Sequence, residues 1–262
     1  MVSLSQKLRF ILNTLCFLIF LSPISFPFVF QANAAEEGLD VYYKLDTEKA
    51  VDESGNGRDG VIEGKPKLVD GVEGKAWQFD GTTAINMDFP IMTAPDPALS
   101  IRCFMKADDV RGQHVIYDEG GAWTGYCVRI MDDELQFATV CCDQNHPPPV
   151  IISAPFSDTK NWHELAAVYD HGKMALYLDG EKVGEEETKW KELGGHGQSG
   201  AIGDMSPGDT AFGPAGEHFV GSLDEFRIYS RGLVEKELKL QVSKRGNLAV
   251  TWGALKFRRT QL

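Results

Sequence analysis

Hydrophobic and polar side chains alternate with a period of two along many short segments of this chain. The segments are residues 100–106, 126–131, 135–140, 163–169, 174–178 and 226–229. This pattern predicts antiparallel strands with one face in a core and the other toward solvent. Asp132-Asp133 and Asp179-Gly180 separate neighbouring segments and predict hairpin turns. The predicted fold class is therefore all-β, a sandwich of two antiparallel sheets.

One stretch near the C-terminus departs from the alternation. Ser230 is a suitable N-cap, and the apolar residues that follow it are separated by charged ones; they are Leu233, Leu238, Leu240 and Val242. This pattern predicts a short helix of two or three turns at the edge of the sandwich. Residues 243–262 form a basic C-terminal tail, for which an added strand, a sorting or partner-binding segment and a frayed end all remain open.

Residues 1–34 have the features of a removable signal peptide. Lys7 and Arg9 precede an apolar stretch at 10–30, and Ala32-Asn33-Ala34 offers small residues at the spacing that a signal peptidase requires. An uncleaved anchor helix is the alternative, because the apolar stretch is long enough to span a bilayer. The prolines within the stretch favour cleavage. We therefore expect a secreted protein, extracellular or periplasmic, with one domain at 35–242 and no membrane span after the signal.

The remaining chain is strongly acidic. With Lys7 and Arg9 removed, 24 Lys and Arg residues face 38 Asp and Glu residues, a net charge of about −14. Nucleic acid is therefore excluded as a partner, because its phosphates require a basic face. Such a charge also fits a protein that binds cations or is simply soluble.

Four cysteines remain after the predicted signal is removed: Cys103, Cys127, Cys141 and Cys142. Four cysteines in an oxidising compartment allow three disulfide pairings. A bond between the adjacent Cys141 and Cys142 is the least favoured because of its geometry. A bridge from Cys127 to Cys141 or to Cys103 is the stronger expectation. The lack of a Cys-x-x-Cys pair argues against a zinc site.

Six segments, read in order, form a family pattern. They are YYKLD (42–46), VDESGNGRDG (51–60), GKAWQFDG (74–81), WHELAAVYD (162–170), MALYLDG (174–180) and FVGSLDEFRIYSRG (219–232). Over residues 39–242 the chain resembles the laminin-G-like, concanavalin A-like jelly-roll domains of secreted bacterial proteins. The resemblance implies a two-sheet jelly roll with a lectin-like architecture and, often, one structural calcium ion. It does not imply a particular ligand.

The loop at 52–60 is rich in the hard oxygen ligands that calcium prefers. The resemblance implies that this loop lies close to the aspartate of the GSLDE segment. Carried over to this chain, the candidate calcium ligands are Asp46, Asp52, Asn56, the carbonyl of Gly57, Asp59 and Asp224. A plain surface turn is the alternative interpretation of the same loop. The spacing also matches an EF-hand loop, but amphipathic helices do not flank it.

The ligand site is predicted from aromatic and polar residues in loops. Trp123, in the segment 118–124, would stack on a sugar ring, and Asp143 and Asn145, in the segment 142–149, would accept hydrogen bonds from hydroxyls. A core or rim position is the alternative for Trp123. The Glu-x-Asp-x-x-Glu pattern of related hydrolases is absent from the sequence. The predicted function is a secreted, non-catalytic module that binds a glycan and carries a structural calcium ion. The first alternative is a structural or adhesion protein that binds a protein or another cell-surface component. The second is a glycoside hydrolase of the same fold.

Overall fold

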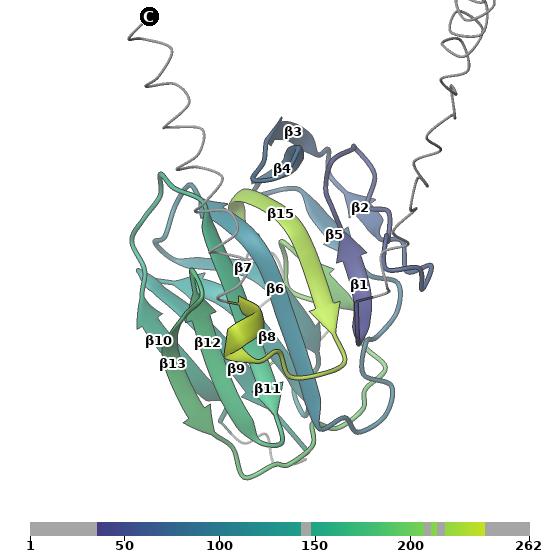
Figure 1. Cartoon of the computed structure of the whole chain (residues 1–262), viewed down its shortest axis with the longest axis vertical. Helices are drawn as coiled ribbons and strands as arrows, with labels where there is room; N and C mark the ends of the chain where they lie inside the picture. The colour runs from purple at the N-terminus through teal and green to yellow at the C-terminus, as the bar shows by residue number, and fades with distance from the viewer. Residues whose placement is uncertain (1–35, 143–147, 207–210, 214–217, 239–262) are drawn as a thin grey trace, which may run out of the picture. The chain divides into compact units, whose positions relative to one another are not determined.

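The strand arrangement comes from a computed structural model, which describes residues 36–142, 148–206, 211–213 and 218–238. These residues form two antiparallel sheets (Figure 1). The larger sheet contains β1 (Leu39–Tyr43), β3 (Lys67–Asp70), β4 (Lys75–Asp80), β6 (Ala98–Ala107), β11 (His163–Asp170), β12 (Lys173–Leu178), β13 (Glu181–Glu187) and β15 (Val220–Tyr229). The smaller sheet contains β2 (Val61–Glu63), β5 (Ala84–Asn86), β7 (Gln113–Gly120), β8 (Gly125–Met131), β9 (Glu134–Val140), β10 (Val150–Pro155) and β14 (Gly200–Ile202).

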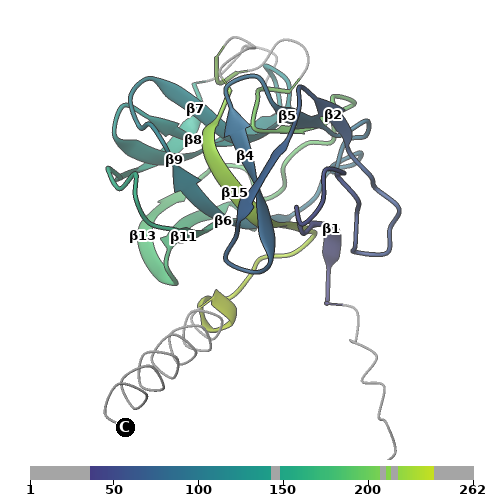
Figure 2. The ribbon, with the colours of Figure 1, turned by 90° about the horizontal axis from the view of Figure 1, so that it is seen from above.

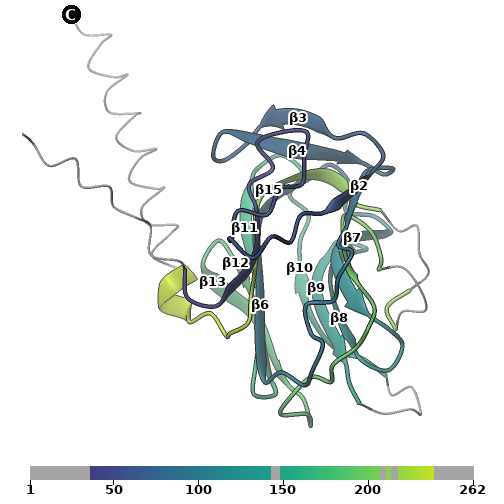
Figure 3. The ribbon, with the colours of Figure 1, turned by 90° about the vertical axis from the view of Figure 1, so that its right-hand side faces the viewer.

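The two sheets stack as layers (Figure 3). Hydrogen bonds set the order β13-β12-β11-β6-β15-β4-β3 in the larger sheet, where β1 also pairs with β15. The order in the smaller sheet is β10-β9-β8-β7-β14-β5-β2. The predicted two-sheet sandwich is therefore confirmed. Within the part of the chain that the structure describes, no helix is long and apolar enough to cross a membrane.

The main core lies between the sheets and follows the predicted alternation. On β6, Leu99, Ile101 and Cys103 belong to this core, while Ser100 and Arg102 between them do not. The same alternation holds in the hairpin of β8 and β9, whose turn at Asp132-Asp133 has φ values of 47° and 64°. Positive φ values at both turn residues are those of a tight hairpin turn whose twist matches the flanking strands.

The C-terminal segment covers the outer face of the larger sheet. After β15 the chain forms a helical turn at 235–238 (Figure 2). Leu233 and Leu238 pack with Tyr229 in a small apolar cluster. Ser230 does not cap this turn as predicted, because its hydroxyl donates to the carbonyl of Gly38 at 3.3 Å. The rest of the predicted helix and the tail at 243–262 lie outside the described residues.

Strand β15 changes partner halfway along. Its first half, through Leu223, pairs with β4, and its second half, from Phe226, pairs with β1. The register on β6 shifts between Asp224 and Arg227, and Glu225 has a φ of 54°. Asp224 therefore lies at an irregularity where N-terminal and C-terminal strands meet.

Two further predictions from the sequence are corrected by the fold. The segment 118–124 is not all loop, because β7 extends through Asp118 and Glu119 to Gly120. Both carboxylates are buried within the strand. Because their side chains are polar, the sequence of β7 does not show the alternation of apolar and polar residues that predicts a strand.

The cysteine pairing also differs from expectation. Cys141 and Cys142 form the disulfide, while Cys103 and Cys127 are free and buried. Cys141 faces the main core, and Cys127 packs in a separate cluster with Val115 and Met205. The expected bridge between Cys127 and Cys141 therefore does not form, because the two side chains lie on opposite faces of the smaller sheet.

Candidate functional site

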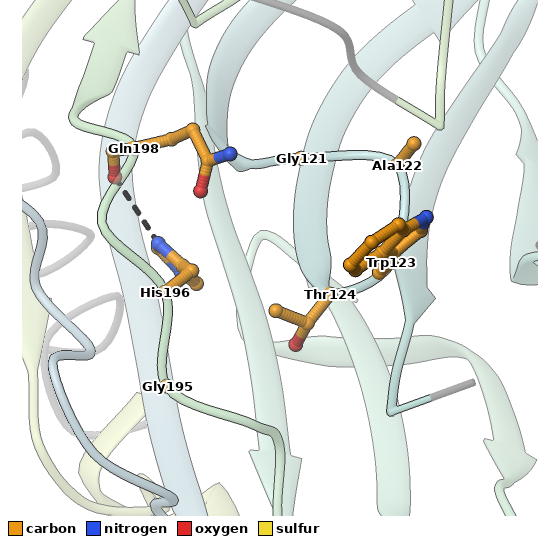
Figure 4. Close-up of a pocket in the computed structure, with 7 residues that line it drawn as sticks. All are labelled: Gly121, Ala122, Trp123, Thr124, Gly195, His196 and Gln198. Atoms are coloured by element: carbon orange, nitrogen blue, oxygen red, sulfur yellow. Dashed lines mark hydrogen bonds between the residues drawn. The ribbon is translucent and has the colours of Figure 1, made fainter. Parts of the chain in front are cut away.

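A surface pocket of about 510 Å³ lies beside the turn between β7 and β8. Its walls are two chain segments that are far apart in sequence (Figure 4). The lining residues are Gly121, Ala122, Trp123, Thr124, Gly195, His196 and Gln198. Trp123 is one of the most exposed large hydrophobic side chains of the described residues, with half of its surface accessible. The pocket thus combines an aromatic face, small residues and a few polar groups, which is the usual composition of a small-ligand site.

The first wall is the four-residue connection from β7 to β8. It closes through a hydrogen bond from the Gly121 amide to the Thr124 carbonyl at 2.8 Å. Gly120 precedes it with a φ of 98°, and a Cβ at that position would lie 2.3 Å from the Thr124 oxygen. Only glycine fits there, so the sharp turn presents the Trp123 indole at the surface.

The second wall is the segment from Gly194 to Gln198. The His196 amide donates to the Met92 carbonyl at 2.9 Å. The His196 ring is only 2% exposed, and its Nδ1 lies 3.1 Å from the Gln198 carbonyl oxygen. This contact folds the segment back on itself and leaves the Gln198 side chain at the pocket (Figure 4).

A buried carboxylate anchors this second wall. Glu119 accepts hydrogen bonds from the Ile91 amide at 2.6 Å and from the Tyr126 hydroxyl at 2.8 Å. Tyr117 donates to it as well, and His196 Nε2 lies 3.4 Å from its Oε1. Burial raises the pKa of Glu119, while these donors and His196 act against the rise. Glu119 thus joins β7 and β8 to the segment that contains Ile91 and to the pocket wall that contains His196.

The predicted ligand residues have different outcomes. Trp123 lies in the pocket wall and is half-exposed, so it is not a core residue, while the alternative of a rim position stands. Asp143 and Asn145 lie outside the described residues. His196 and Gln198 were not anticipated, although the glycine-rich stretch at 194–200 that contains them is visible in the sequence.

A second hollow of similar volume lies at the edge of the larger sheet. It is lined by Lys173, Met174 and three consecutive glutamates, Glu185, Glu186 and Glu187. This lining contains no aromatic side chain and is dominated by negative charge. The pocket at Trp123 is therefore the better candidate for an uncharged organic ligand.

The predicted calcium ligands fall into two groups, of which the first organises the loop after β1. Asp52 accepts hydrogen bonds from the amides of Tyr42, Ser54 and Arg58 at 2.9 to 3.0 Å. Burial acts to raise the pKa of Asp52, but these hydrogen bonds outweigh it and lower the pKa. Asp59 accepts from the Asp52 amide at 2.8 Å. Both carboxylates are thus engaged by the backbone of their own loop.

Two further candidates in this loop are polar groups on its surface. The side-chain amide of Asn56 donates to the carbonyls of Leu39 and Asp40 at 3.1 and 3.0 Å, which ties the loop to β1. Gly57 has a φ of 70°, a conformation that glycine adopts without strain.

The second group, Asp46 and Asp224, holds the turn between β3 and β4. Asp224 Oδ2 accepts from the amides of Val72 and Glu73 at 2.7 and 3.0 Å. Asp46 Oδ1 accepts from the Lys75 amide at 2.6 Å. Asp224 Oδ1 is buried and has no hydrogen-bond partner. Burial raises the pKa of Asp224 to about 6, and the nearby carboxylates of Glu225 and Asp46 add to this rise.

A cation at Asp224 Oδ1 fits this surplus of negative charge. The described residues contain no cluster of three or more His, Cys, Asp or Glu side chains able to hold a metal. A calcium ion would therefore need backbone carbonyls or water as further ligands, which calcium accepts readily.

The family model described as the concanavalin A-like lectin/glucanases superfamily matches residues 79–239. The chain belongs to this superfamily. The match includes β6 to β15 and both walls of the Trp123 pocket. No curated protein matches the sequence.

Several solved structures share the superfamily fold. Domain 4 of AbnA, an extracellular arabinanase from Geobacillus stearothermophilus in complex with arabinotriose, has a TM-score of 0.62 at 19% identity, over 78% of this chain and 98% of that one. The binding domain of Paraclostridial Mosquitocidal Protein 1 has a TM-score of 0.64 at 15% identity, over 78% and 52%. The binding domain of botulinum neurotoxin DC, in complex with rat synaptotagmin II, has a TM-score of 0.59 at 13% identity, over 79% and 52%.

These structures show that the chain has the same fold as the three domains. The chain spans about half the length of the two toxin binding domains. Both toxin structures are binding domains, and one of them is in complex with rat synaptotagmin II. The arabinanase domain is in complex with arabinotriose.

Proposed function

We propose that this protein is a secreted, non-catalytic binding module that takes a sugar residue of a glycan into the Trp123 pocket. The observation that carries the proposal is the half-exposed Trp123 ring at the mouth of a pocket with few polar groups. Aromatic faces pack against the apolar faces of sugar rings, while amide and hydroxyl groups bond to sugar hydroxyls. Thr124 and Gln198 supply such groups.

The lining favours a neutral sugar over an anionic one. Among the described lining residues, only His196 has an ionisable side chain. Its ring faces the buried carboxylate of Glu119, at 3.4 Å, and so does not offer a free positive charge to a ligand. Anionic ligands are usually held by charge-assisted hydrogen bonds from Arg or Lys. The acidic charge of the chain also repels sulfated or sialylated glycans.

The glycan complex of the arabinanase domain supports this class of ligand, since that domain has the same fold over nearly its whole length. Binding of a protein or cell-surface partner is the second candidate, supported by the neurotoxin domain in complex with synaptotagmin. A glycoside hydrolase would need two carboxylates on opposite sides of the sugar. The described lining residues of the Trp123 pocket contain no carboxylate.

Calcium is part of the proposal as a structural ion. Asp224 Oδ1 and the neighbouring Asp46 are the side chains that would hold it, because Asp224 Oδ1 is buried without a hydrogen-bond partner and both carboxylates contact the turn between β3 and β4. Bound there, calcium would supply positive charge at the junction of β1, β4 and β15. Asp52 and Asp59 would support the adjoining loop through their backbone hydrogen bonds.

The test is glycan-array binding of the exported protein, followed by calorimetry with the best neutral oligosaccharide. Trp123→Ala should weaken that binding at least about tenfold, because the stacking face is lost. Trp162→Ala is the matched control, since Trp162 is partly exposed but does not line the pocket. Equal affinity for the wild type and Trp123→Ala would rule out this pocket. Silence of the folded wild type on the array would favour a protein partner.

A further inference from the structure

The disulfide-bonded residues Cys141 and Cys142 contact both walls of the Trp123 pocket. They follow Val140, the last residue of β9, which pairs with Gly125 at the start of β8. The Cys142 amide donates to the Trp123 carbonyl at 2.8 Å. On the other side, Cys141 Sγ accepts a hydrogen bond from the Gly194 amide at 3.1 Å. One dipeptide thus joins segments that are otherwise distant in sequence.

Gly194 lies at the centre of this connection. Its carbonyl accepts a hydrogen bond from the Thr124 hydroxyl at 3.1 Å, so it bonds to the first wall as well as to Cys141. A Cβ at Gly194 would lie 3.2 Å from Cys142 Sγ. The two walls therefore meet through close backbone and sulfur packing, with little space for rearrangement.

The conformation of Cys142 depends on its surroundings. Its φ of 67° lies in the left-handed region, which residues other than glycine rarely adopt. Cys141 is fully buried in the main core. When the bond between the two sulfurs breaks, the atoms must separate to a non-bonded distance. Because Cys141 is held by the core and by its hydrogen bond from Gly194, we expect Cys142 to be the residue that moves. Its backbone amide is hydrogen-bonded to the Trp123 carbonyl, so this movement would reach Trp123.

We propose that the Cys141–Cys142 disulfide positions the two walls of the Trp123 pocket, and that ligand binding there requires its oxidised form. The identity of the ligand in this inference rests on the proposed function. The effect of the disulfide on the position of the pocket walls does not. In the reaction, a dithiol reductant transfers two electrons and two protons. The S–S bond breaks, Cys141 and Cys142 become thiols, and the dithiol becomes a disulfide.

The other two cysteines do not take part in this exchange. Cys103 and Cys127 are buried thiols, and burial raises the pKa of each well above its usual value. A buried thiol that resists ionisation is a poor nucleophile and does not attack a disulfide. Reduction therefore acts on one bond of the described chain, at the pocket.

The experiment compares the exported wild type before and after treatment with dithiothreitol. Two quantities are measured: the affinity for the neutral oligosaccharide found on the array, and the indole NMR signal of Trp123, assigned by its loss in Trp123→Phe. We expect reduction to weaken binding at least about tenfold, as loss of a preorganised site does, and to shift the Trp123 signal.

The variant Cys141→Ser/Cys142→Ser is the matched control. It should resemble the reduced wild type in both measurements and should not respond to dithiothreitol. If it does not fold, the reduced wild type alone decides, with circular dichroism to show that the sandwich is intact.

Unchanged affinity and an unchanged Trp123 signal on reduction would overturn the inference, as would free thiols at Cys141 and Cys142 in the exported protein. If the wild type binds no glycan in either state, the proposed function fails. The inference is then decided by the Trp123 signal, because a shift on reduction supports it and no shift overturns it.

Discussion

Asp118 and Glu119 are neighbours on β7 with different surroundings. Glu119 turns toward the core and the pocket, where two tyrosines and His196 surround it. Asp118 is fully buried, and its Oδ2 accepts from the Ser206 amide at 2.9 Å. Burial raises the pKa of Asp118 to about 7, despite the hydrogen bonds from Ser206. The two adjacent carboxylates thus hold different parts of the chain: Glu119 contacts Tyr126 and His196, and Asp118 is hydrogen-bonded to Ser206.

The pKa of Asp118 leads to a pH-dependent prediction. The folded pKa of about 7 exceeds the usual 3.8, so the folded state favours the protonated acid. The stability from this group is complete below the lower value and is lost as pH rises through the higher one. The melting temperature of Asp118→Asn, minus that of the wild type, should therefore increase between pH 5 and pH 8. Thermal unfolding followed by circular dichroism measures it, and a constant difference would contradict the assigned shift.

At the scale of elements, an ion pair links β6 and β11 on the outer face of the larger sheet. Arg102 Nε donates to Glu164 Oε1 at 2.7 Å, and the two side chains are 6% and 4% exposed. Ala166 is directly opposite Arg102 in the strand register, so the pair forms diagonally across the strands. Leu233, from the segment that follows β15, packs against Ala166 in the apolar cluster on this face. The C-terminal segment therefore helps to cover a buried charge pair.

Removal of one member of this pair should be more harmful than removal of both. Arg102→Met leaves the Glu164 carboxylate buried without its partner, which should lower the free energy of unfolding by about 3 kcal/mol. Arg102→Met/Glu164→Leu removes both charges and should recover most of that loss. Urea unfolding of the two variants and the wild type provides the comparison. A double variant as unstable as the single one would mean that packing, rather than charge, explains the loss.

At the scale of the whole molecule, β15 joins the two ends of the domain. It pairs with β6, β4 and β1, so strands from the N-terminal, central and C-terminal parts of the chain meet along it. The unneutralised carboxylate of Asp224 lies at the change of partner from β4 to β1. A cation at this point would therefore stabilise the closure of the sandwich, rather than a single loop.

Calcium should accordingly act on global stability. At a concentration about a hundred times its dissociation constant, it should raise the melting temperature of the wild type by roughly 5–10 °C, and chelator should reverse the effect. Asp224→Asn should lose the response, and Asp59→Asn should keep it because Asp59 hydrogen-bonds within its own loop. Scanning calorimetry with calcium and with chelator measures the effect. Loss of the response in Asp59→Asn alone would place the ion in the 52–60 loop instead.

The sequence by itself determined the features that depend on neighbouring residues. Alternation at 126–131 and 135–140, with Asp132-Asp133 between them, was sufficient to predict the hairpin of β8 and β9. Such hairpins are local, so their pattern and their turn residues lie within one short window. The resemblance carried by the family segments then predicted a jelly roll of two antiparallel sheets. The position of Trp123 in a turn between strands could be predicted for a similar reason, because an aromatic residue among small ones is visible in the sequence, while its role in binding stays a prediction.

The tertiary structure decided which distant residues share a site. Thr124 and Gly194 are 70 residues apart, and Cys141 and Gly194 are 53 apart, yet each pair is hydrogen-bonded at the pocket. The sequence predicted six oxygen ligands for calcium, but only the fold showed that Asp52 already accepts backbone hydrogen bonds while Asp224 Oδ1 has none. A strand can be predicted because its alternation of apolar and polar residues lies within a short stretch of sequence. A site depends on which distant strands pair and on which polar atoms find hydrogen-bond partners as a result.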